Sequence, residues 1–290
     1  MNKTGIIGIG TSGLIGSRVT ELLGSKYDFM NLGITSGVDI TKPETLKLIE
    51  ENSSHKYVLH LAAKADVDGC EKDKDLGENG PAWQINVKGV ENVLDACRKN
   101  NKTFVYVSTD FVFDGENTPD GGYTEDDTPN PINWYAKTKH EGEKRVINSG
   151  IDYIILRTAY PYRKKYEEKK DFVRAILDRL KNGDKVVGVT DHIMTPTFID
   201  DFAHCLEAIV DKTQTGIFNV VGSQSLSPYD AVLEIVKAFN ITNPVISKTT
   251  REEFFRDRAA RPFNLSLNNA KIQRLGVFPL TFTEGLEELK

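Results

Sequence analysis

The segment Gly5-Ile-Ile-Gly-Ile-Gly10-Thr-Ser-Gly13-Leu-Ile-Gly16 decides the fold of this chain. Its beginning, Gly5–Ile9, is typical of a buried strand, whereas Leu14–Leu23 repeats apolar residues with the period of a helix. The glycines of the segment include the spacing GxGxxG, which permits a tight turn and brings backbone N–H groups close to a diphosphate. The first turn of the helix adds unpaired N–H donors and a partial positive charge. The segment therefore predicts a dinucleotide-binding loop.

Outward from this segment, short apolar runs alternate with amphipathic stretches, and a capping box at 41–44 indicates a further helix start. This alternation predicts an α/β fold: a doubly wound parallel sheet (Rossmann fold) with a smaller discontinuous substrate-binding lobe. We expect residues 1–160 and 196–223 to form the dinucleotide-binding domain, and residues 161–195 and 224–290 to form the lobe. The other predicted strands are 57–61, 103–108, 151–156 and 216–222, and the other predicted helices are 85–97, 134–147, 172–180 and 227–239.

The bulk composition restricts the class of partner. The chain has 290 residues, of which 39% are hydrophobic and 27% are charged, as in ordinary globular proteins. Its net charge of -5 argues against nucleic acid or an anionic membrane as a general partner. Cys70, Cys97 and Cys205 are far apart and odd in number, which argues against a disulfide framework or a zinc site. Because we find neither a signal peptide nor a stretch of roughly 20 apolar residues, we expect a cytoplasmic protein without a membrane span.

Residues just after the predicted strands and at the start of one helix indicate the chemistry. Tyr135 and Lys139 are four residues apart, so they share one face of the predicted helix. We expect the ammonium to lower the pKa of the phenol, which would let Tyr135 transfer a proton near neutral pH. Thr109 follows a strand and is placed to hydrogen-bond a substrate carbonyl oxygen while negative charge grows on it. With the glycine loop, these residues predict hydride transfer from a nicotinamide cofactor to a carbonyl carbon.

One expected feature of an NAD site is missing. An acidic residue about 20 positions after the glycine loop normally binds the ribose 2′-hydroxyl of NAD. The corresponding stretch, Met30-Asn-Leu-Gly-Ile-Thr-Ser36, has neither an acidic residue nor an arginine for the 2′-phosphate of NADP. Asn31, Thr35 and Ser36 could serve either cofactor. The sequence therefore predicts NADP or NAD, without a preference.

The order of these motifs resembles the extended short-chain dehydrogenase/reductase superfamily and, within it, the dTDP-4-dehydrorhamnose reductase family. The most specific likeness lies in HLAAKADVD (60–68) with Cys70-Glu71, and in STDFVFDG (108–115). Shorter matches are Asp39-Ile-Thr41, Tyr123-Thr-Glu125, Tyr135-Ala-Lys-Thr-Lys139, Leu156-Arg-Thr158, Pro196-Thr197 and Arg261-Pro262. The resemblance implies reduction of a 4-keto-6-deoxy sugar carried on a nucleotide. It also implies a possible homodimer, because homodimers are common in this superfamily.

By this resemblance, Thr109, Tyr135 and Lys139 form the catalytic set, and the last two also contact the cofactor. The guanidinium of Arg261 would grip a phosphate in two places. The cofactor-binding residues that the loop and the resemblance imply are Gly10, Ser12, Gly13, Leu14, Ile15, Gly16, Asp39, Ile40, Leu61, Ala62, Ala63 and Lys64. The implied substrate-binding residues are Val67, Asp68, Asp110, Tyr160 and Arg261.

Two departures from the family touch the expected sugar site. Ala159-Tyr-Pro-Tyr162 stands where the family usually has a tryptophan, and a charge run at 163–170 (RKKYEEKK) stands where it usually has glycines. We expect the charge run to be a solvated loop or a helix start. Two other functions stay open: a sugar-nucleotide epimerase of the same superfamily, and a non-catalytic cofactor-binding regulatory subunit such as the beta subunit of methionine adenosyltransferase. A dehydratase is disfavoured, because Phe111 stands where that class places a glutamate.

Overall fold

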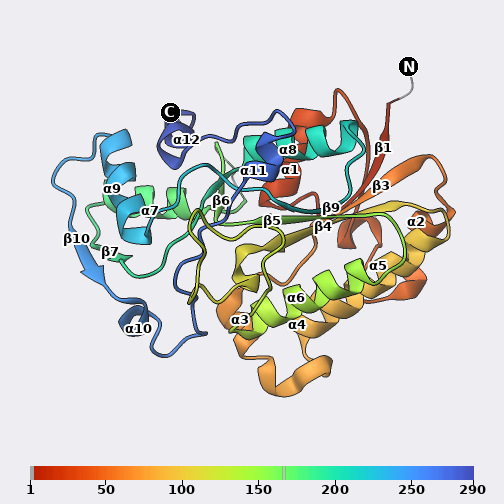
Figure 1. Ribbon diagram of the computed structural model, residues 1–290, viewed down its shortest axis with the longest axis horizontal. Helices are drawn as coiled ribbons and strands as arrows, with labels where there is room; N and C mark the ends of the chain where they lie inside the picture. Colours follow the sequence, from red (N-terminus) through yellow and green to blue (C-terminus); the bar gives the residue numbers. More distant parts are fainter. Residues whose placement is uncertain (1–2, 165, 167) are drawn as a thin grey trace.

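The centre of the protein is a six-stranded sheet, seen in a computed structural model that describes residues 3–164, 166 and 168–290 (Figure 1). The strand order is β2-β1-β3-β4-β5-β9, and all neighbouring strands are parallel. The chain order reverses between β1 and β3, so the loops after these strands leave in opposite directions and open a crevice. The strands are β1 (Gly5–Ile9), β2 (Asp28–Leu32), β3 (His55–His60), β4 (Thr103–Thr109), β5 (Tyr153–Thr158) and β9 (Gly216–Asn219).

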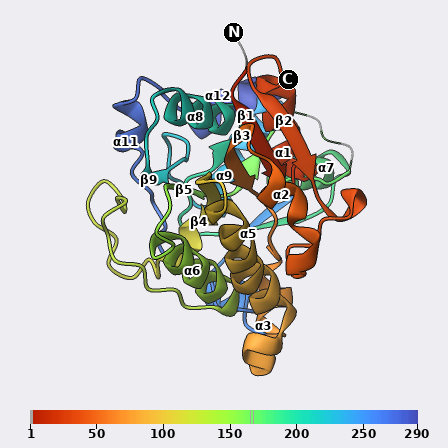
Figure 2. The same cartoon turned by 90° about the vertical axis from the view of Figure 1, so that its right-hand side faces the viewer.

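Helices cover both faces of the sheet, as Figures 1 and 2 show. Successive side chains of a strand point to opposite faces, so Ile6 joins one apolar core and Ile7 the other. The first core packs against α1 (Leu14–Leu23), α8 (Ile199–Asp211) and α11 (Ala270–Gln273), and the second against α2 (Lys47–Glu51), α5 (Gly89–Arg98) and α6 (Trp134–Ile147). The predicted doubly wound parallel sheet is confirmed.

Later parts of the chain build a further apolar core of their own, on the left of Figure 1. Val173, Leu177, Val232 and Phe282 meet there, and β10 pairs with β7 in a small parallel sheet. How the chain divides into two lobes stays a prediction. The elements of this region are β6 (Pro161–Tyr162), α7 (Phe172–Lys181), β7 (Val186–Val189), β8 (Thr197–Phe198), α9 (Pro228–Ala238), β10 (Ile246–Thr249), α10 (Arg251–Phe254) and α12 (Phe282–Glu287).

Several local predictions differ from the structure. The helix predicted at 85–97 begins with α4 (Pro81–Trp83) and a π-helical turn over Gln84–Lys88 before α5, and α3 (Val67–Glu71) precedes them. The capping box at 41–44 is wrong: the hydroxyl of Thr41 donates to Asp39 Oδ1 over 2.7 Å, and the short helix Pro43–Thr45 has no side-chain cap. Asp39 competes successfully because its carboxylate is two residues away and accepts from the Thr41 backbone as well.

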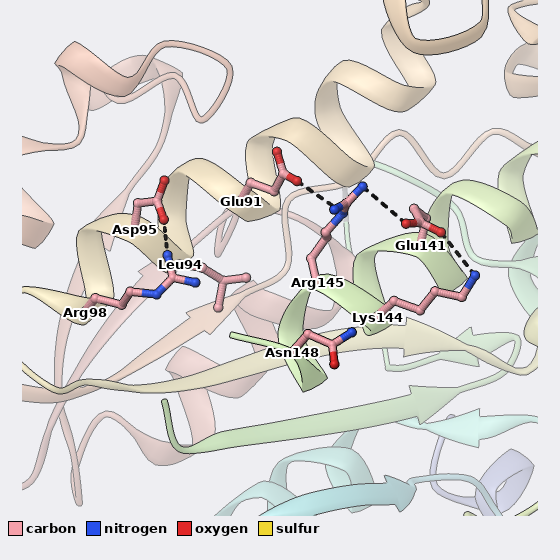
Figure 3. Close-up of a pocket in the computed structure, with 8 residues that line it drawn as sticks. All are labelled: Glu91, Leu94, Asp95, Arg98, Glu141, Lys144, Arg145 and Asn148. Atoms are coloured by element: carbon pink, nitrogen blue, oxygen red, sulfur yellow. Dashed lines mark hydrogen bonds and ion pairs between the residues drawn. The ribbon is translucent and has the colours of Figure 1, made fainter. Parts of the chain in front are cut away.

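The outer surface between α5 and α6 is covered with ion pairs (Figure 3). Arg145 bonds Glu91 over 3.1 Å and Glu141 over 3.3 Å, and Lys144 bonds Glu141 over 3.2 Å. These charges line a hollow that contains none of the predicted site residues. In the part of the chain that the structure describes, no helix is both long enough and apolar enough to cross a bilayer.

Candidate active site

Two adjoining cavities open beyond the carboxyl ends of the central strands. They have volumes of about 650 and 640 Å³, and Gly10 and Ala63 line both. The predicted residues in the first cavity are Gly10, Gly13, Leu14, Ile15, Gly16, Leu61, Ala63, Val67, Thr109, Asp110, Tyr135, Lys139, Tyr160 and Arg261. Those in the second are Gly10, Ser12, Asp39, Ile40, Ala62 and Ala63. The sheet thus gathers residues from far apart in the sequence around one crevice.

The glycine loop fits a diphosphate sterically. Gly10 has φ +79°, and a Cβ there would lie 2.8 Å from the backbone nitrogen of Ala62. A Cβ on Gly16 would lie 2.5 Å from the Cα of Thr11. No side chain caps the first turn of α1, whose N-cap is Gly13. The loop therefore packs closely against the strand ends and leaves the helix N-terminus available to an anion.

The polar groups that line the second cavity suit a nucleoside. Asn31, Thr35 and Asp39 line it, and none of its described lining residues is a lysine or arginine. Hydrogen bonds from the hydroxyl and backbone N–H of Thr41 lower the pKa of Asp39 below its usual value, so this carboxylate is charged at neutral pH. The cavity therefore has one acceptor carboxylate, which arises from the loop after β2 rather than from the strand end that the NAD pattern specifies.

The helix α6 presents both predicted proton-transfer residues to the first cavity. Asn133 caps the helix by accepting from the backbone N–H of Ala136 over 2.8 Å, which fixes the first turn. Lys139 is buried; its ammonium donates to the carbonyl of Val107 over 2.8 Å and lies 4.1 Å from the ring centre of Tyr106. Burial lowers the pKa of Lys139 to about 7, against the opposing charge of Glu143.

The expected lowering of the Tyr135 pKa is wrong for this structure. Desolvation raises the pKa of Tyr135 above its usual value, and the charge of Asp110 adds to the rise, against a hydrogen bond with Thr109. The sequence spacing places Lys139 on the same helix face, but its ammonium is held by Val107 on β4. Tyr135 is therefore a neutral phenol that holds its proton at neutral pH.

Thr109 and Asp110 form a buried pair at the end of β4. The Thr109 hydroxyl donates to Asp110 Oδ1 over 2.9 Å and accepts from the N–H of Phe111 over 3.2 Å. The other carboxylate oxygen, Oδ2, has no hydrogen-bond partner among the described residues. Burial raises the pKa of Asp110 to about 7, although the hydrogen bond from Thr109 opposes the rise. The pair therefore changes protonation near neutral pH.

Replacing Asp110 by asparagine should change how stability depends on pH. The unfolded carboxyl titrates at 3.8 and the folded one at about 7, so the folded state binds more protons between these values and stability falls as the pH rises through them. From about pH 5 to about pH 8, the wild type should lose about 2 kcal/mol more free energy of unfolding than Asp110→Asn. Urea unfolding across this range measures it. The exposed Asp120→Asn is the control, and a wild-type curve parallel to that of Asp110→Asn would contradict the shift.

Tyr160 presents a hydroxyl of fixed polarity to the first cavity. His192 Nδ1 lies 2.7 Å from the carbonyl of Pro262, which can only accept, so Nδ1 carries the proton and Nε2 is an acceptor. Tyr160, 2.9 Å away, then donates its hydroxyl proton to Nε2. Its φ of +41° is costly for an aromatic residue and is tolerated where packing enforces it. The Tyr160 oxygen is left to accept a hydrogen bond from a ligand.

Two predicted residues do not line either cavity. The ammonium of Lys64 donates to the carbonyl of Gly69 and to Asp73. Asp68 forms an ion pair with Arg261 over 2.8 Å, which places the carboxylate behind the guanidinium rather than in the cavity lining. The cofactor contact of Lys64 and the substrate contact of Asp68 stay predictions. In the structure Asp68 is positioned to orient Arg261.

Sequence reasoning missed several residues of the first cavity. Val107 and Ser108 line it from the end of β4, and Phe255 comes from a stretch without a recognisable motif. The strand-end rule could have found Ser108, which directly precedes Thr109. The charge run at 163–170 is not simply solvated: Arg163 is only 5% exposed, and Lys169 lines the cavity. The expectation of a solvated loop is therefore wrong for Arg163, whereas Lys169 is exposed as expected and also lines the cavity.

Comparisons with known proteins agree with this geometry. Residues 4–289 match the family described as RmlD substrate binding domain. A dTDP-4-dehydrorhamnose reductase of Aggregatibacter actinomycetemcomitans is 30% identical over 295 residues, covering 97% of this chain and 96% of the relative. Methionine adenosyltransferase 2 subunit beta of Bos taurus is 29% identical over 258 residues, covering 85% and 75%.

A solved structure extends the likeness to the whole fold. The crystal structure of dTDP-4-dehydrorhamnose reductase from Bacillus anthracis in complex with NADP has a TM-score of 0.87 at 29% identity, covering 99% of this chain and 98% of that one. The order of motifs in the sequence had implied the same family. The chain therefore belongs to the dTDP-4-dehydrorhamnose reductase family, which matches as the RmlD substrate binding domain, within the extended short-chain dehydrogenase/reductase superfamily.

Proposed function

We propose that this protein is an NAD(P)H-dependent reductase of a keto group on a nucleotide-linked deoxysugar, similar to dTDP-4-dehydrorhamnose reductase. The observation that carries the proposal is one cavity lined by Thr109, Tyr135, Lys139 and the glycine loop. The donor set matches the chemistry, because a carbonyl that receives hydride needs a proton donor and a hydrogen bond to its oxygen. Family membership supports the substrate class.

The bound cofactor would supply the hydride, and the chain's own residues would handle the proton. Tyr135, a neutral phenol, would give its proton to the substrate oxygen as the carbonyl carbon accepts the hydride, so that the product is an alcohol. Lys139, which lines the same cavity, would stabilise the phenolate that remains through its positive charge. A protonated Asp110 could donate to Thr109 Oγ1 and so free the Thr109 hydroxyl to bind the substrate oxygen.

The other end of the substrate would face Arg261. The guanidinium is 10% exposed at the side chain, donates to Asp68 over 2.8 Å and lies 4.6 Å from the ring centre of Phe255. An arginine held in this way has a fixed plane and a fixed charge, which suits bidentate binding of a diphosphate. Val67, Asp110 and Tyr160 complete the proposed sugar site.

The test is oxidation of NADH and NADPH by the purified protein with dTDP-4-dehydrorhamnose, followed by the absorbance of the reduced nicotinamide. We expect turnover with the ketosugar and none with dTDP alone, and the ratio of kcat/KM for the two cofactors gives the preference. Binding of cofactor with no turnover of any ketosugar nucleotide would contradict the reductase proposal.

A second candidate function has a specific observation in its favour. Besides the reductase, the protein is 29% identical over most of its length to a methionine adenosyltransferase subunit beta. In that case the cofactor site would serve partner binding, and turnover would be absent. The gathered Thr109, Tyr135 and Lys139 favour the enzyme, because a regulatory role needs no proton donor at this position. The epimerase alternative predicts interconversion of a sugar nucleotide without net oxidation of NAD(P)H.

Assembly and location are also proposals. We propose a homodimer in the cytoplasm, on the ground of superfamily membership. Light scattering coupled to size exclusion measures the mass directly, and a monomer at micromolar concentration would contradict the dimer.

A further inference from the structure

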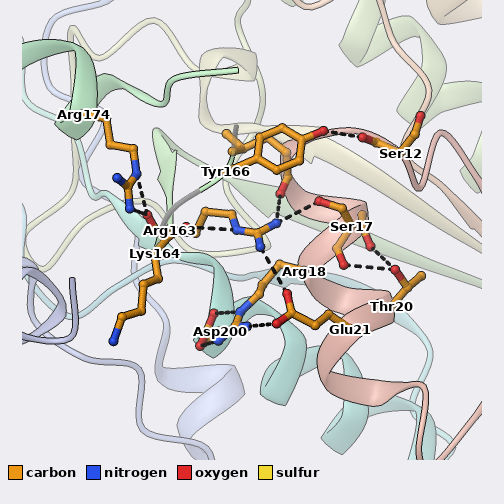
Figure 4. A network of polar contacts seen from close by, with 12 residues as sticks. Ser12, Ser17, Arg18, Thr20, Glu21, Arg163, Lys164, Tyr166, Arg174 and Asp200 are labelled. Atoms are coloured by element: carbon orange, nitrogen blue, oxygen red, sulfur yellow. Dashed lines mark hydrogen bonds and ion pairs between the residues drawn. The ribbon is translucent and has the colours of Figure 1, made fainter. Parts of the chain in front are cut away.

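The described part of the charge run, residues 163, 164, 166 and 168–170, is here called the strap. Its Arg163 and Tyr166 contact α1 and the glycine loop. Figure 4 shows the contacts. Arg163 donates to the carbonyl of Leu14 over 3.3 Å, to Ser17 Oγ over 2.8 Å and to Glu21 Oε2 over 3.2 Å. All three partners belong to α1, the helix whose N-terminus completes the glycine loop. A buried guanidinium needs such partners, because an unpaired buried charge is costly. Arg163 therefore fixes the start of the strap on α1.

A second contact holds the middle of the strap on the loop itself. The hydroxyl of Tyr166 donates to the backbone carbonyl of Ser12, which lies between the loop glycines. The guanidinium of Arg163 lies 5.1 Å from the ring centre of Tyr166, so the two contacts support each other. The other side of the strap reaches α7: Arg163 N–H donates to Asp171 Oδ2 over 3.2 Å, and Asp171 caps that helix. The strap thus connects the glycine loop to α7.

The strap adds a cation to the cavity that the glycine loop lines. The glycine loop, Gly10 to Gly16, contains no basic residue. The first cation of α1, Arg18, is engaged by Asp200 over 2.6 Å and by Glu21 over 2.6 Å. Lys139 is held by Val107, and Arg261 by Asp68. Lys169 lines the same cavity as Gly10 and Gly13, and it arrives there from the strap.

We propose that Lys169 binds a diphosphate at the glycine loop, and that Arg163 and Tyr166 act as positioning residues for it. The inference rests on the proposed function, because it takes the occupant of this cavity to be a diphosphate ester. Two diphosphates have this chemistry: that of the dinucleotide and that of the sugar nucleotide. A lysine is a compact point charge on a flexible stem, which suits an anion that binds and leaves.

The test compares Lys169→Ala with Lys170→Ala. Lys170 is the matched control, because it is the adjacent lysine of the strap and its ammonium pairs with Asp178 on α7, over 2.5 Å. Kd is measured for NADPH by fluorescence, and for ADP and dTDP by calorimetry. We expect Lys169→Ala to weaken NADPH and ADP about tenfold, the loss of one charge-assisted hydrogen bond, and Lys170→Ala to leave both unchanged. Lys169→Arg should restore most of the binding.

The outcomes separate the possible failures. Weaker binding of dTDP with unchanged NADPH would assign Lys169 to the substrate diphosphate. If Lys169→Ala binds NADPH, ADP and dTDP as tightly as the wild type does, the strap proposal alone is overturned. If diphosphate binding depends on Lys169 but the protein reduces no ketosugar, the strap proposal holds and the reductase proposal fails. A wild type that binds none of the three would overturn both.

The positioning role has its own readout. Tyr166→Phe removes the hydroxyl that bonds the Ser12 carbonyl and lies 3.1 Å from Glu168 Oε2, so NADPH binding should weaken about threefold. If Tyr166 acts through Lys169, the double variant Tyr166→Phe/Lys169→Ala should bind NADPH no more weakly than Lys169→Ala. Additive losses in the double variant would show that Tyr166 acts on the loop independently and would overturn its positioning role.

Discussion

Tyr135→Phe should lower kcat for ketosugar reduction at least about a hundredfold and leave the Kd for NADPH nearly unchanged, because a positioned general acid typically contributes about 10²–10⁴-fold. The substitution removes one hydroxyl and keeps the ring, which packs edge-to-face against Phe111 with ring centres 6.1 Å apart. The fold and the cavity should therefore persist. Single-turnover oxidation of NADPH with dTDP-4-dehydrorhamnose measures the chemical step directly.

The control for this prediction is a tyrosine of the same cavity. Tyr160→Phe also removes a hydroxyl, but that hydroxyl donates to His192, and its expected role is to accept a hydrogen bond from the substrate. It should raise KM more than it lowers kcat, since it contributes to binding in both ground and transition states. A Tyr135→Phe enzyme with normal kcat would remove Tyr135 from the mechanism.

The pH profile distinguishes the two proton-transfer schemes. The sequence pattern had predicted a Tyr135 phenol acidified by Lys139, which would titrate near neutral pH. In the structure, burial raises the pKa of Tyr135, whereas the pKa values of Asp110 and Lys139 lie at about 7. A kcat/KM inflection near neutral pH that disappears in Asp110→Asn would therefore belong to Asp110.

The sequence predicts a helix or strand well where a single segment contains the whole pattern that specifies it. The bounds of β1, α1 and α6 agree with the sequence, because apolar period and turn glycines are read within a few residues. The edge strand β2, DFMNL, was not found, since the polar and exposed Asp28 and Asn31 interrupt its apolar pattern. The face shared by Tyr135 and Lys139 followed from helix geometry, and the cavity contains both.

Long-range partners could not be read in the same way. Arg163 and Leu14 are 149 residues apart, and the charge run gave no sign that its first residue is buried on α1. The spacing of Tyr135 and Lys139 likewise said nothing of Val107, which holds the ammonium. In each case the sequence does not tell which helix or strand lies opposite the side chain. The fold decides this, since it places α1 opposite Arg163 and β4 opposite Lys139.

A buried ion pair fixes the catalytic helix to the sheet. Glu143 on α6 accepts from Arg157 on β5 through two bonds, Nε to Oε1 over 3.0 Å and Nη2 to Oε2 over 2.8 Å. The side chains are only 1% and 2% exposed. Although burial alone would raise it, the nearby His140 ring, with Nδ1 3.8 Å from Oε2, and the hydrogen bonds from Arg157 lower the pKa of Glu143 to about 2. The carboxylate is thus charged at every pH at which the enzyme would work.

Glu143→Gln should lower the free energy of unfolding by about 3 kcal/mol or more, because removing one partner leaves the charge of Arg157 buried and uncompensated. Urea unfolding at neutral pH measures the loss. Glu141→Gln on the same helix is the matched control: its pairs with Lys144 and Arg145 are exposed, so it should cost less than about 1 kcal/mol. The double variant Glu143→Leu/Arg157→Met should recover much of the loss, since it removes both charges. Equal midpoints for Glu143→Gln and Glu141→Gln would show that α6 is held to β5 by packing rather than by this ion pair.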